Sequence, residues 1–191
     1  MTRVFAYGVA ALMVLGGVGQ AQAQEMDSRN LFSGGPNFFS GGGSSPIPRT
    51  TVSYIGNDAP GTIVINTAER KLYLVEGDGS ALQYGVGVGR IGFTWKGTHK
   101  ISAKKEWPAW TPPPEMRARV RGLPVHMAGG VENPLGARAM YLGSTLYRIH
   151  GSNEPETIGQ AVSSGCFRLM NDDVIDLYGR VKVGAKVIVM R

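Results

Sequence analysis

The chain has 191 residues, with 20 Lys and Arg against 14 Asp and Glu, a formal net charge of +6 and a single cysteine. The basic excess favours anionic surroundings, such as an envelope polymer or the face of a membrane. The sequence shows no basic stripe interleaved with aromatic residues, no zinc-spaced cysteines and no phosphate-binding glycine loop with its lysine. We therefore expect no nucleic-acid partner and no bound metal.

Residues 1–23 have the pattern of a secretory signal peptide. Arg3 supplies the positive start, an almost uninterrupted apolar stretch runs from Val4 to Val18, and Ala21-Gln-Ala23 supplies the small residues before a cleavage site. The stretch is too short for a comfortable membrane span, and a retained N-terminal anchor is the alternative. We expect cleavage after Ala23 and an exported, soluble protein of net charge +5, because cleavage removes Arg3 from the +6 total.

Residues 24–50 are rich in Gly, Ser, Asn and Pro, as in Ser33-Gly-Gly-Pro36 and Ser40-Gly-Gly-Gly-Ser-Ser-Pro46. A segment of this composition does not bury enough apolar surface to order itself, so we predict a flexible linker. Residues 51–191 are long enough to build a hydrophobic core. We predict that they form one catalytic domain.

Strand signals dominate residues 51–191. Alternating or continuous apolar runs predict strands at 62–66, 71–75, 83–88, 97–102, 139–143, 146–150 and 186–190, with a turn at 67–70 joining the first two. Residues 155–161 favour a short turn, and Asn171 is predicted to cap a helix at 172–181. The apolar face of that helix is expected to carry Val174, Leu177, Tyr178 and Val181. The predicted fold class is mainly β, with one or two short helices.

Cys166 is the only cysteine, so it cannot belong to an intramolecular disulfide in an oxidising exported compartment. It follows Ser164 and Gly165, and Arg168 comes two residues later, whereas a structural cysteine is expected among apolar neighbours. His150 lies 16 positions earlier. A lone thiol with a histidine at this spacing indicates a nucleophile and its base. An inert packed cysteine and an intermolecular pair are the alternatives.

The residues around this pair resemble a known family. The runs that carry the resemblance are His150-Gly-Ser-Asn-Glu-Pro155, Ile158-Gly159, Ser163-Ser-Gly-Cys-Phe-Arg168, Asp173-Val-Ile-Asp-Leu-Tyr178, Trp110-Thr-Pro-Pro113 and Glu132-Asn-Pro-Leu-Gly-Ala-Arg138. In this order they closely resemble the catalytic domain of the L,D-transpeptidases over roughly residues 60–191. The resemblance implies a β-sandwich-like domain of mixed sheets with small helices.

The resemblance also implies an enzyme of peptidoglycan remodelling. Such enzymes attack the bond between the L-centre of meso-diaminopimelate and the terminal D-alanine of a tetrapeptide stem, and hold the acyl part as a thioester on cysteine. An amine of a neighbouring stem then takes the acyl group, which gives a 3→3 cross-link. The implied partners are peptidoglycan stem peptides, with no metal or organic cofactor. We expect a monomer in the periplasm or cell envelope.

The resemblance and the chemistry together suggest a role for each residue. Cys166 is expected to be the nucleophile, and His150 the general base and acid. In the family a backbone carbonyl just after the histidine orients the imidazole, and Gly151 stands at that position here. Amides of the turn, those of Gly165 and Cys166, are expected to hold the oxyanion.

Ser164, Arg168 and Trp110 are predicted substrate-binding residues. One common form of the motif has histidine at the position of Ser164, which puts any assistance from a second imidazole in doubt. Arg168 is expected to bind a stem-peptide carboxylate through its planar fork, with a surface salt bridge as the alternative. Trp110, together with Trp107, is predicted to wall the peptide groove or to pack in a loop or core.

Several acceptors of the acyl group are compatible with the same chemistry. Water as acceptor would make the protein an L,D-carboxypeptidase, a free D-amino acid would make it an exchange enzyme, and a protein lysine would make it an anchor of envelope proteins. A non-catalytic wall-binding module with the same fold is the alternative from a different class.

Overall fold

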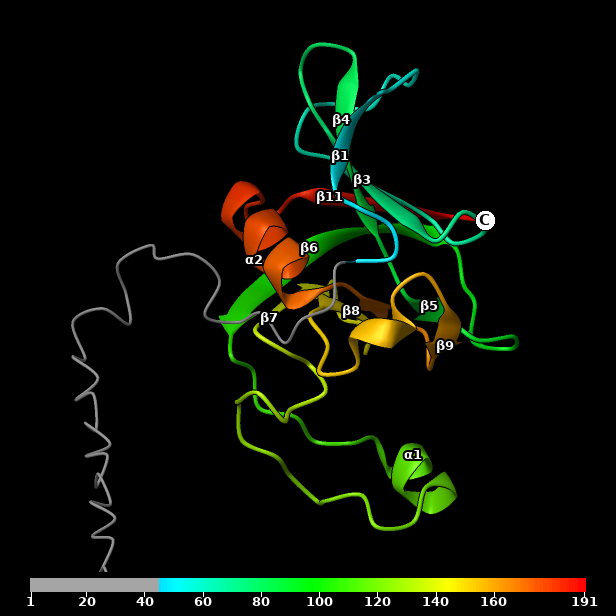
Figure 1. Ribbon diagram of the computed structural model, residues 1–191, viewed down its shortest axis with the longest axis vertical. Helices are drawn as coiled ribbons and strands as arrows, with labels where there is room; N and C mark the ends of the chain where they lie inside the picture. Colours follow the sequence, from blue (N-terminus) through cyan, green and yellow to red (C-terminus); the bar gives the residue numbers. More distant parts are fainter. Residues whose placement is uncertain (1–44) are drawn as a thin grey trace, which may run out of the picture. The chain divides into compact units, whose positions relative to one another are not determined.

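The computed structural model describes residues 45–191, so the predicted signal peptide and residues 24–44 of the predicted linker lie outside the described residues. The described part is mainly β, with mixed sheets and two short α-helices, as predicted (Figure 1). Between residues 45 and 191, no helix combines the length and the apolar character that a membrane crossing requires.

Nine strands form one large sheet in the order β1-β4-β3-β2-β11-β6-β7-β8-β10. Two further strands, β5 (Val88–Gly89) and β9 (Ala161–Ser163), pair in parallel as a small second sheet. The strands of the large sheet are β1 (Thr50–Ser53), β2 (Ile63–Asn66), β3 (Lys71–Val75), β4 (Ser80–Gly85), β6 (Gly97–Glu106), β7 (Arg138–Leu142), β8 (Arg148–His150), β10 (Phe167–Arg168) and β11 (Lys186–Met190).

The β2–β3 hairpin and the last strand form the centre of the large sheet. β2 and β3 pair antiparallel around the turn at 67–70, which confirms the predicted hairpin. β11 lies between β2, to which it is parallel, and β6, to which it is antiparallel. Ile63, Val64 and Ile65 are each at most 5% exposed. Burial on both faces is typical of a strand with a parallel neighbour, and it anchors the sheet that continues into β6, β7 and β8.

The helix α2 (Asn171–Arg180) closes the hydrophobic core. Its predicted apolar face is confirmed, because Val174 and Leu177 are buried in the core cluster and Tyr178 packs against that cluster. Val181, which was predicted as the last helical residue, caps the helix and is also buried in the cluster. Lys104 Nζ donates to the carbonyls of Tyr178 and Val181, each at 2.6 Å. These bonds satisfy carbonyl groups that the end of a helix leaves without intrahelical partners.

The predicted cap of α2 is wrong. The helix begins at Asn171, with Met170 at the cap position and no side-chain cap hydrogen bond. Asn171 Oδ1 instead accepts from the Ala137 amide at 2.9 Å, and its Nδ2 donates to the Ser152 carbonyl at 3.1 Å. The Asn171 side chain therefore bonds two backbone groups that are distant in the sequence, and it does not cap the helix.

Several element boundaries also differ from the prediction. β6 continues to Glu106 instead of ending at 102, because residues 103–106 pair with β7. β4 begins at Ser80 because it pairs with β1, and β8 begins only at Arg148. The structure adds α1 (Pro114–Arg119), which was not predicted, and the short turn expected at 155–161 contains the 3₁₀ helix η2 (Pro155–Thr157). Pairing partners, and not local composition, decide where these strands end.

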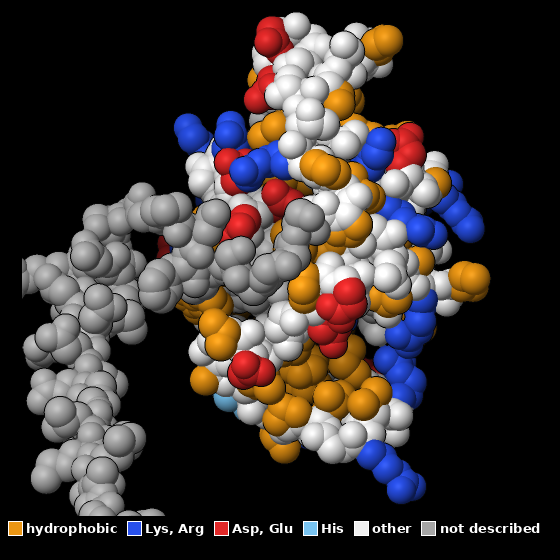
Figure 2. Space-filling model, in the orientation of Figure 1, with side chains coloured by type: hydrophobic (Ala, Val, Ile, Leu, Met, Phe, Trp, Pro, Cys, Tyr) orange, Lys and Arg blue, Asp and Glu red, His pale blue; other side chains and the backbone are white. Residues whose placement is uncertain are grey.

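The connection between β6 and β7, residues 107–137, carries α1 and lies at the lower end of the view (Figure 1). Figure 2 shows hydrophobic side chains gathered in this lower part of the face, with Lys and Arg along one side. Val120, Val125 and Val131 of this connection are 47%, 69% and 64% exposed. This segment therefore leaves large apolar side chains in contact with solvent.

Candidate active site

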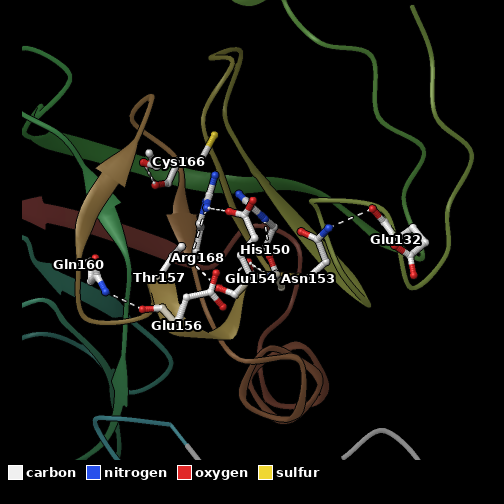
Figure 3. A network of polar contacts seen from close by, with 12 residues as sticks. Glu132, His150, Asn153, Glu154, Glu156, Thr157, Gln160, Cys166 and Arg168 are labelled. Atoms are coloured by element: carbon white, nitrogen blue, oxygen red, sulfur yellow. Dashed lines mark hydrogen bonds and ion pairs between the residues drawn. The ribbon is translucent and has the colours of Figure 1, made fainter. Parts of the chain in front are cut away.

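Two neighbouring parallel strands bring the predicted histidine and cysteine to one face of the sheet. β8 and β10 pair with His150 directly opposite Arg168. Arg148 lies two residues before His150 on β8 and shares its face. Cys166 directly precedes β10, and the charges of Arg148 and Arg168 both act on its thiol. These side chains therefore form one cluster, in which Cys166, Arg168 and His150 lie close together (Figure 3).

His150 is buried, and its Nδ1 lies 2.6 Å from the carbonyl oxygen of Gly151, so the contact expected from the family is present. A carbonyl oxygen can only accept a hydrogen bond, so Nδ1 carries the proton and Nε2 keeps its lone pair. Burial, together with the positive charges of Arg168 and Arg148, lowers the pKa of His150 to about 3. The imidazole is therefore neutral near pH 7, in the tautomer that a general base needs.

The Gly151 backbone is held in place by close neighbours. Its amide donates to the Arg138 carbonyl at 3.0 Å, and Asn171 bridges Ala137 and Ser152 directly beside it. A Cβ atom at position 151 would lie 2.2 Å from Asn171 Oδ1, so only glycine fits without a shift. The Asn171 bridge therefore fixes the segment whose carbonyl contacts His150 Nδ1.

Cys166 is the free thiol of the described chain and is half-buried. Its Sγ donates to the Leu146 carbonyl at 3.9 Å, and no hydrogen bond joins it to His150 within residues 45–191. Burial raises the pKa of the Cys166 thiol, and the positive charges of Arg148 and Arg168 oppose that rise. The thiol is therefore protonated at rest, so a base must remove its proton before it can attack.

The turn before the cysteine is organised by Ser163. Its Oγ donates to the Cys166 carbonyl at 2.7 Å and accepts from the Gly165 amide at 3.1 Å. Gly165 has φ of +105°, a conformation that L side chains rarely adopt. The oxyanion role of the Gly165 amide stays a prediction. In this structure that amide donates its hydrogen bond to Ser163 Oγ.

Trp95 contacts the same turn from the loop between β5 and β6, and sequence reasoning missed it. Its Nε1 donates to the Gly165 carbonyl at 2.9 Å. Its ring stacks on Tyr147 with centroids 4.5 Å apart and an interplanar angle of 13°. A tryptophan in a glycine-containing loop carries no local signal of such a contact, because the partner lies 70 residues away in the sequence.

Arg148 is the second site residue that was not predicted. Its Nε is buried and finds no hydrogen-bond partner within residues 45–191. Its guanidinium carbon lies 5.6 Å from the centre of the Tyr141 ring, while its charge lowers the pKa of Cys166 against the effect of burial. Side chains alternate between the two faces of a strand, so the predicted strand at 146–150 already placed Arg148 on the same face as His150. This alternation was the sequence signal that could have identified Arg148 as a site residue.

Arg168 is engaged within the protein. One guanidinium nitrogen, Nη1, lies 2.6 Å from Glu154 Oε2 and 3.4 Å from the Thr157 hydroxyl (Figure 3). The salt bridge given as the alternative for this residue is therefore present, and binding of a substrate carboxylate stays a prediction.

The structure does not bring Trp110 into the cluster. Trp110 lies on the connection 107–137, where its backbone pairs with Met127 through two hydrogen bonds of 2.8 Å. Ser164 is half-buried in the turn before the nucleophile. The substrate contacts of both residues stay predictions. Between residues 45 and 191, no three His, Cys, Asp or Glu side chains gather in a way that could hold a metal ion.

The arrangement has the parts of an acyl-transfer site. A neutral imidazole with a free Nε2 can take a proton from a nearby thiol, and two arginines favour the thiolate that results. In the turn before Cys166, the Gly165 amide is bonded to Ser163 Oγ and the Gly165 carbonyl to Trp95 Nε1.

Comparison with known proteins agrees with this description. Residues 60–189 match the family model of the YkuD L,D-transpeptidase catalytic domain. The probable L,D-transpeptidase YbiS of Escherichia coli (strain K12) is 40% identical over 134 residues, which are 65% of this chain and 43% of that protein. YcfS, a probable L,D-transpeptidase of the same strain, is 39% identical over 141 residues, which are 68% and 44%. The chain spans less than half the length of these curated relatives.

Two solved structures share the fold. An L,D-transpeptidase from Mycobacterium smegmatis is 21% identical with a TM-score of 0.53, over 74% of this chain and 67% of that one. A Brucella melitensis protein described as a probable carnitine operon oxidoreductase is 46% identical with a TM-score of 0.50, over 74% and 92%. The first likeness shows the fold alone.

The resemblance found in the motifs is therefore confirmed over most of the described chain. The matched residues 60–189 include β8, which carries His150, and Cys166 with the strand β10 that follows it. The chain belongs to the YkuD family of L,D-transpeptidase catalytic domains, which is a family of enzymes.

Proposed function

We propose that this protein is an L,D-transpeptidase of peptidoglycan, with Cys166 as its nucleophile and His150 as its base. The observation that carries the proposal is the 2.6 Å contact between His150 Nδ1 and the Gly151 carbonyl, on the strand beside Cys166. This contact leaves Nε2 unprotonated and therefore able to accept the thiol proton. The family match supplies the reaction class, because its members are named L,D-transpeptidases.

In the first half-reaction, Cys166 Sγ attacks the carbonyl carbon at the L-centre of meso-diaminopimelate while its proton passes to His150 Nε2. A sulfur–carbon bond forms, and the carbonyl electron pair moves onto oxygen. When this oxyanion collapses, the carbon–nitrogen bond to D-alanine breaks and His150 returns the proton to the leaving amine. The products are free D-alanine and a thioester on Cys166.

In the second half-reaction, the side-chain amine of a neighbouring stem attacks the thioester carbonyl carbon. His150 Nε2 takes a proton from the attacking nitrogen, and the sulfur–carbon bond breaks with its electron pair returning to sulfur. The proton on His150 then restores the Cys166 thiol. The net change is exchange of D-alanine for a 3→3 cross-link, and the thiol and the imidazole return to their starting states.

The geometry supports a neutral resting pair. His150 has a pKa near 3 and the pKa of Cys166 is raised, so neither group is charged near neutral pH. The thiol, now directed to the Leu146 carbonyl, must rotate toward His150 for proton transfer. Catalytic hydrogen bonds are often long without substrate and tighten in the complex. Arg148 then faces the negative charge that develops on sulfur.

Substrate contacts and location complete the proposal. Arg168 is proposed to bind a stem-peptide carboxylate, which would compete with Glu154 for its guanidinium group. Ser164 and Trp110 are proposed to contact the stem peptide. Residues 1–23 are proposed to direct export, so the mature enzyme meets its substrate in the periplasm or cell envelope. It is proposed to act as a monomer.

The test is mass spectrometry of the products that the full chain forms from defined tetrapeptide muropeptides. Release of D-alanine together with dimers is expected, and Cys166→Ala should abolish both. Water, a D-amino acid and a protein lysine compete as acceptors in the same samples, so a tripeptide, an exchanged stem or a lysine adduct would identify another acceptor for the same chemistry. Binding of the muropeptide without D-alanine release would indicate a wall-binding module, and equal rates for the alanine variant would exclude Cys166 as nucleophile.

A further inference from the structure

We propose that Trp95 is a positioning residue that aims the Cys166 amide at the oxyanion. The indole N–H holds the Gly165 carbonyl and thereby sets the direction of the next amide along the chain. This inference rests on the proposed acyl transfer and deepens it, because it assigns the oxyanion donor and names the side chain that orients it.

The contact is built as a rigid support. Trp95 Nε1 donates to the Gly165 carbonyl at 2.9 Å from a half-buried ring. One face of that ring stacks on Tyr147 at 4.5 Å, and Phe167 lies 5.4 Å away at a tilt of 49°. Trp95 and Tyr147 both pack against the hydrophobic core. A donor held by two aromatic neighbours has little freedom to leave the carbonyl that it binds.

Peptide geometry converts this hydrogen bond into an orientation. The Gly165 carbonyl and the Cys166 amide belong to one peptide unit, and no peptide bond described in this chain is cis. In a planar trans peptide the C=O and N–H bonds point in opposite directions. With the carbonyl turned toward Trp95, the Cys166 N–H must therefore point away from the indole.

The other polar backbone groups of these two residues are already engaged. Ser163 Oγ accepts from the Gly165 amide at 3.1 Å and donates to the Cys166 carbonyl at 2.7 Å. Trp95 holds the Gly165 carbonyl. Of the four backbone groups of Gly165 and Cys166, the Cys166 N–H alone has no hydrogen bond within residues 45–191. It belongs to the residue that carries the attacking sulfur, where an oxyanion donor is required.

The turn also resists reorientation from its other side. Gly165 has φ of +105°, and a Cβ atom there would lie 2.5 Å from Tyr147 Cε1. The glycine therefore lies against the same ring on which Trp95 stacks. Tyr147 and Trp95 together confine the peptide unit that precedes the nucleophile.

The test separates oxyanion formation from thiol reactivity. Alkylation of Cys166 by iodoacetamide is a displacement at a saturated carbon and forms no oxyanion, whereas acylation by a carbapenem opens a carbonyl group and does. Trp95→Phe in the full chain should lower the acylation rate constant about 10- to 100-fold. Complete loss of an oxyanion donor lowers kcat by about 10²–10³-fold, and this variant misdirects the donor without removing it. The alkylation rate constant should change less than about 2-fold. Intact mass spectrometry measures both adducts.

Tyr73→Phe is the matched control. It removes one aromatic donor, whose hydroxyl binds Glu69 at 2.5 Å on the exposed side of β3, and it should change neither rate constant. A second variant replaces the indole of Trp95 with benzothiophene, which keeps the ring shape and removes only the N–H group. It should reproduce the selective loss of acylation even if Trp95→Phe folds poorly.

A spectroscopic readout tests the orientation without any reaction. Because the chain has a single cysteine, labelling with ¹⁵N-cysteine gives one amide signal, that of Cys166. That signal should shift in both Trp95 variants and stay in place in Tyr73→Phe. Equal losses of acylation and alkylation, an unmoved amide signal, or a wild type that alkylates but never acylates would each overturn the inference. Acylation by carbapenem without D-alanine release from muropeptides would instead contradict only the proposed function.

Discussion

Replacing Asn171 with Ala tests whether one tertiary bridge holds the segment that orients His150. The Asn171 side chain makes two hydrogen bonds, to the Ala137 amide at 2.9 Å and to the Ser152 carbonyl at 3.1 Å, on either side of Gly151. Truncation removes both bonds and leaves two backbone groups without their partner. A neutral hydrogen bond contributes about 1 kcal/mol and an unsatisfied buried group costs about 1–3 kcal/mol, so we expect the free energy of unfolding to fall by about 2–4 kcal/mol.

Urea denaturation gives the free energy of unfolding, and D-alanine release from tetrapeptide muropeptides gives kcat and KM for the same samples. We expect kcat to fall and KM to change little, because the Gly151 carbonyl acts on His150 and not on the substrate. Asn153→Ala is the matched control, since Asn153 is exposed and makes one hydrogen bond, to the Glu132 carbonyl at 3.1 Å. That control should change stability by about 0.5 kcal/mol or less. Equal stabilities of the two variants would refute the structural role of the bridge, and an unchanged kcat in a destabilised Asn171→Ala would refute its link to catalysis.

Three further predictions follow from charge and backbone conformation. Arg148→Gln should raise the pKa of the Cys166 thiol, which is read from the pH dependence of its alkylation, because the charge of Arg148 lowers that pKa. Arg148→Lys keeps the charge and should leave the pKa close to that of the wild type. An unchanged pKa in Arg148→Gln would show that this charge does not act on the sulfur. Gly165→Ala should lower the free energy of unfolding by about 1–3 kcal/mol because Gly165 has φ of +105°. In the same thermal unfolding series, Gly179→Ala in α2 should raise it by about 0.5–1 kcal/mol, because a Cβ atom there meets nothing within 4 Å. Similar effects at the two sites would contradict the strain argument. Burial raises the pKa of Asp173 from 3.8 to about 6, so its contribution to stability is complete below pH 3.8 and is lost as pH rises through 6. Asp173→Asn should therefore gain stability relative to wild type between pH 4 and pH 8, on the order of 2–3 kcal/mol, and a difference independent of pH would count against the buried carboxyl.

Strands with a regular apolar pattern in the sequence were predictable, and strand segments that form only because a neighbouring strand supplies their hydrogen bonds were not. Residues 63–66 and 71–75 alternate or run apolar beside a turn, so local reading found the hairpin. Lys104, Lys105 and Glu106 carry no such pattern, yet they extend β6 because β7 supplies their hydrogen bonds. The Asn171 side chain was assigned to a helix end because the competing partners, Ala137 and Ser152, lie 34 and 19 residues away.

The sequence by itself determined the family and the mainly β fold, and it singled out Cys166 and His150 as a candidate pair of nucleophile and base. These features depend on residue types and spacings that the chain carries along its own length. Only the tertiary structure decided which groups surround that pair. The pairing of β8 with β10 placed His150 opposite Arg168 and close to Cys166, and a distant loop brought Trp95 to the Gly165 carbonyl. Such contacts join residues far apart in the chain, so their geometry exists only once the sheets have assembled.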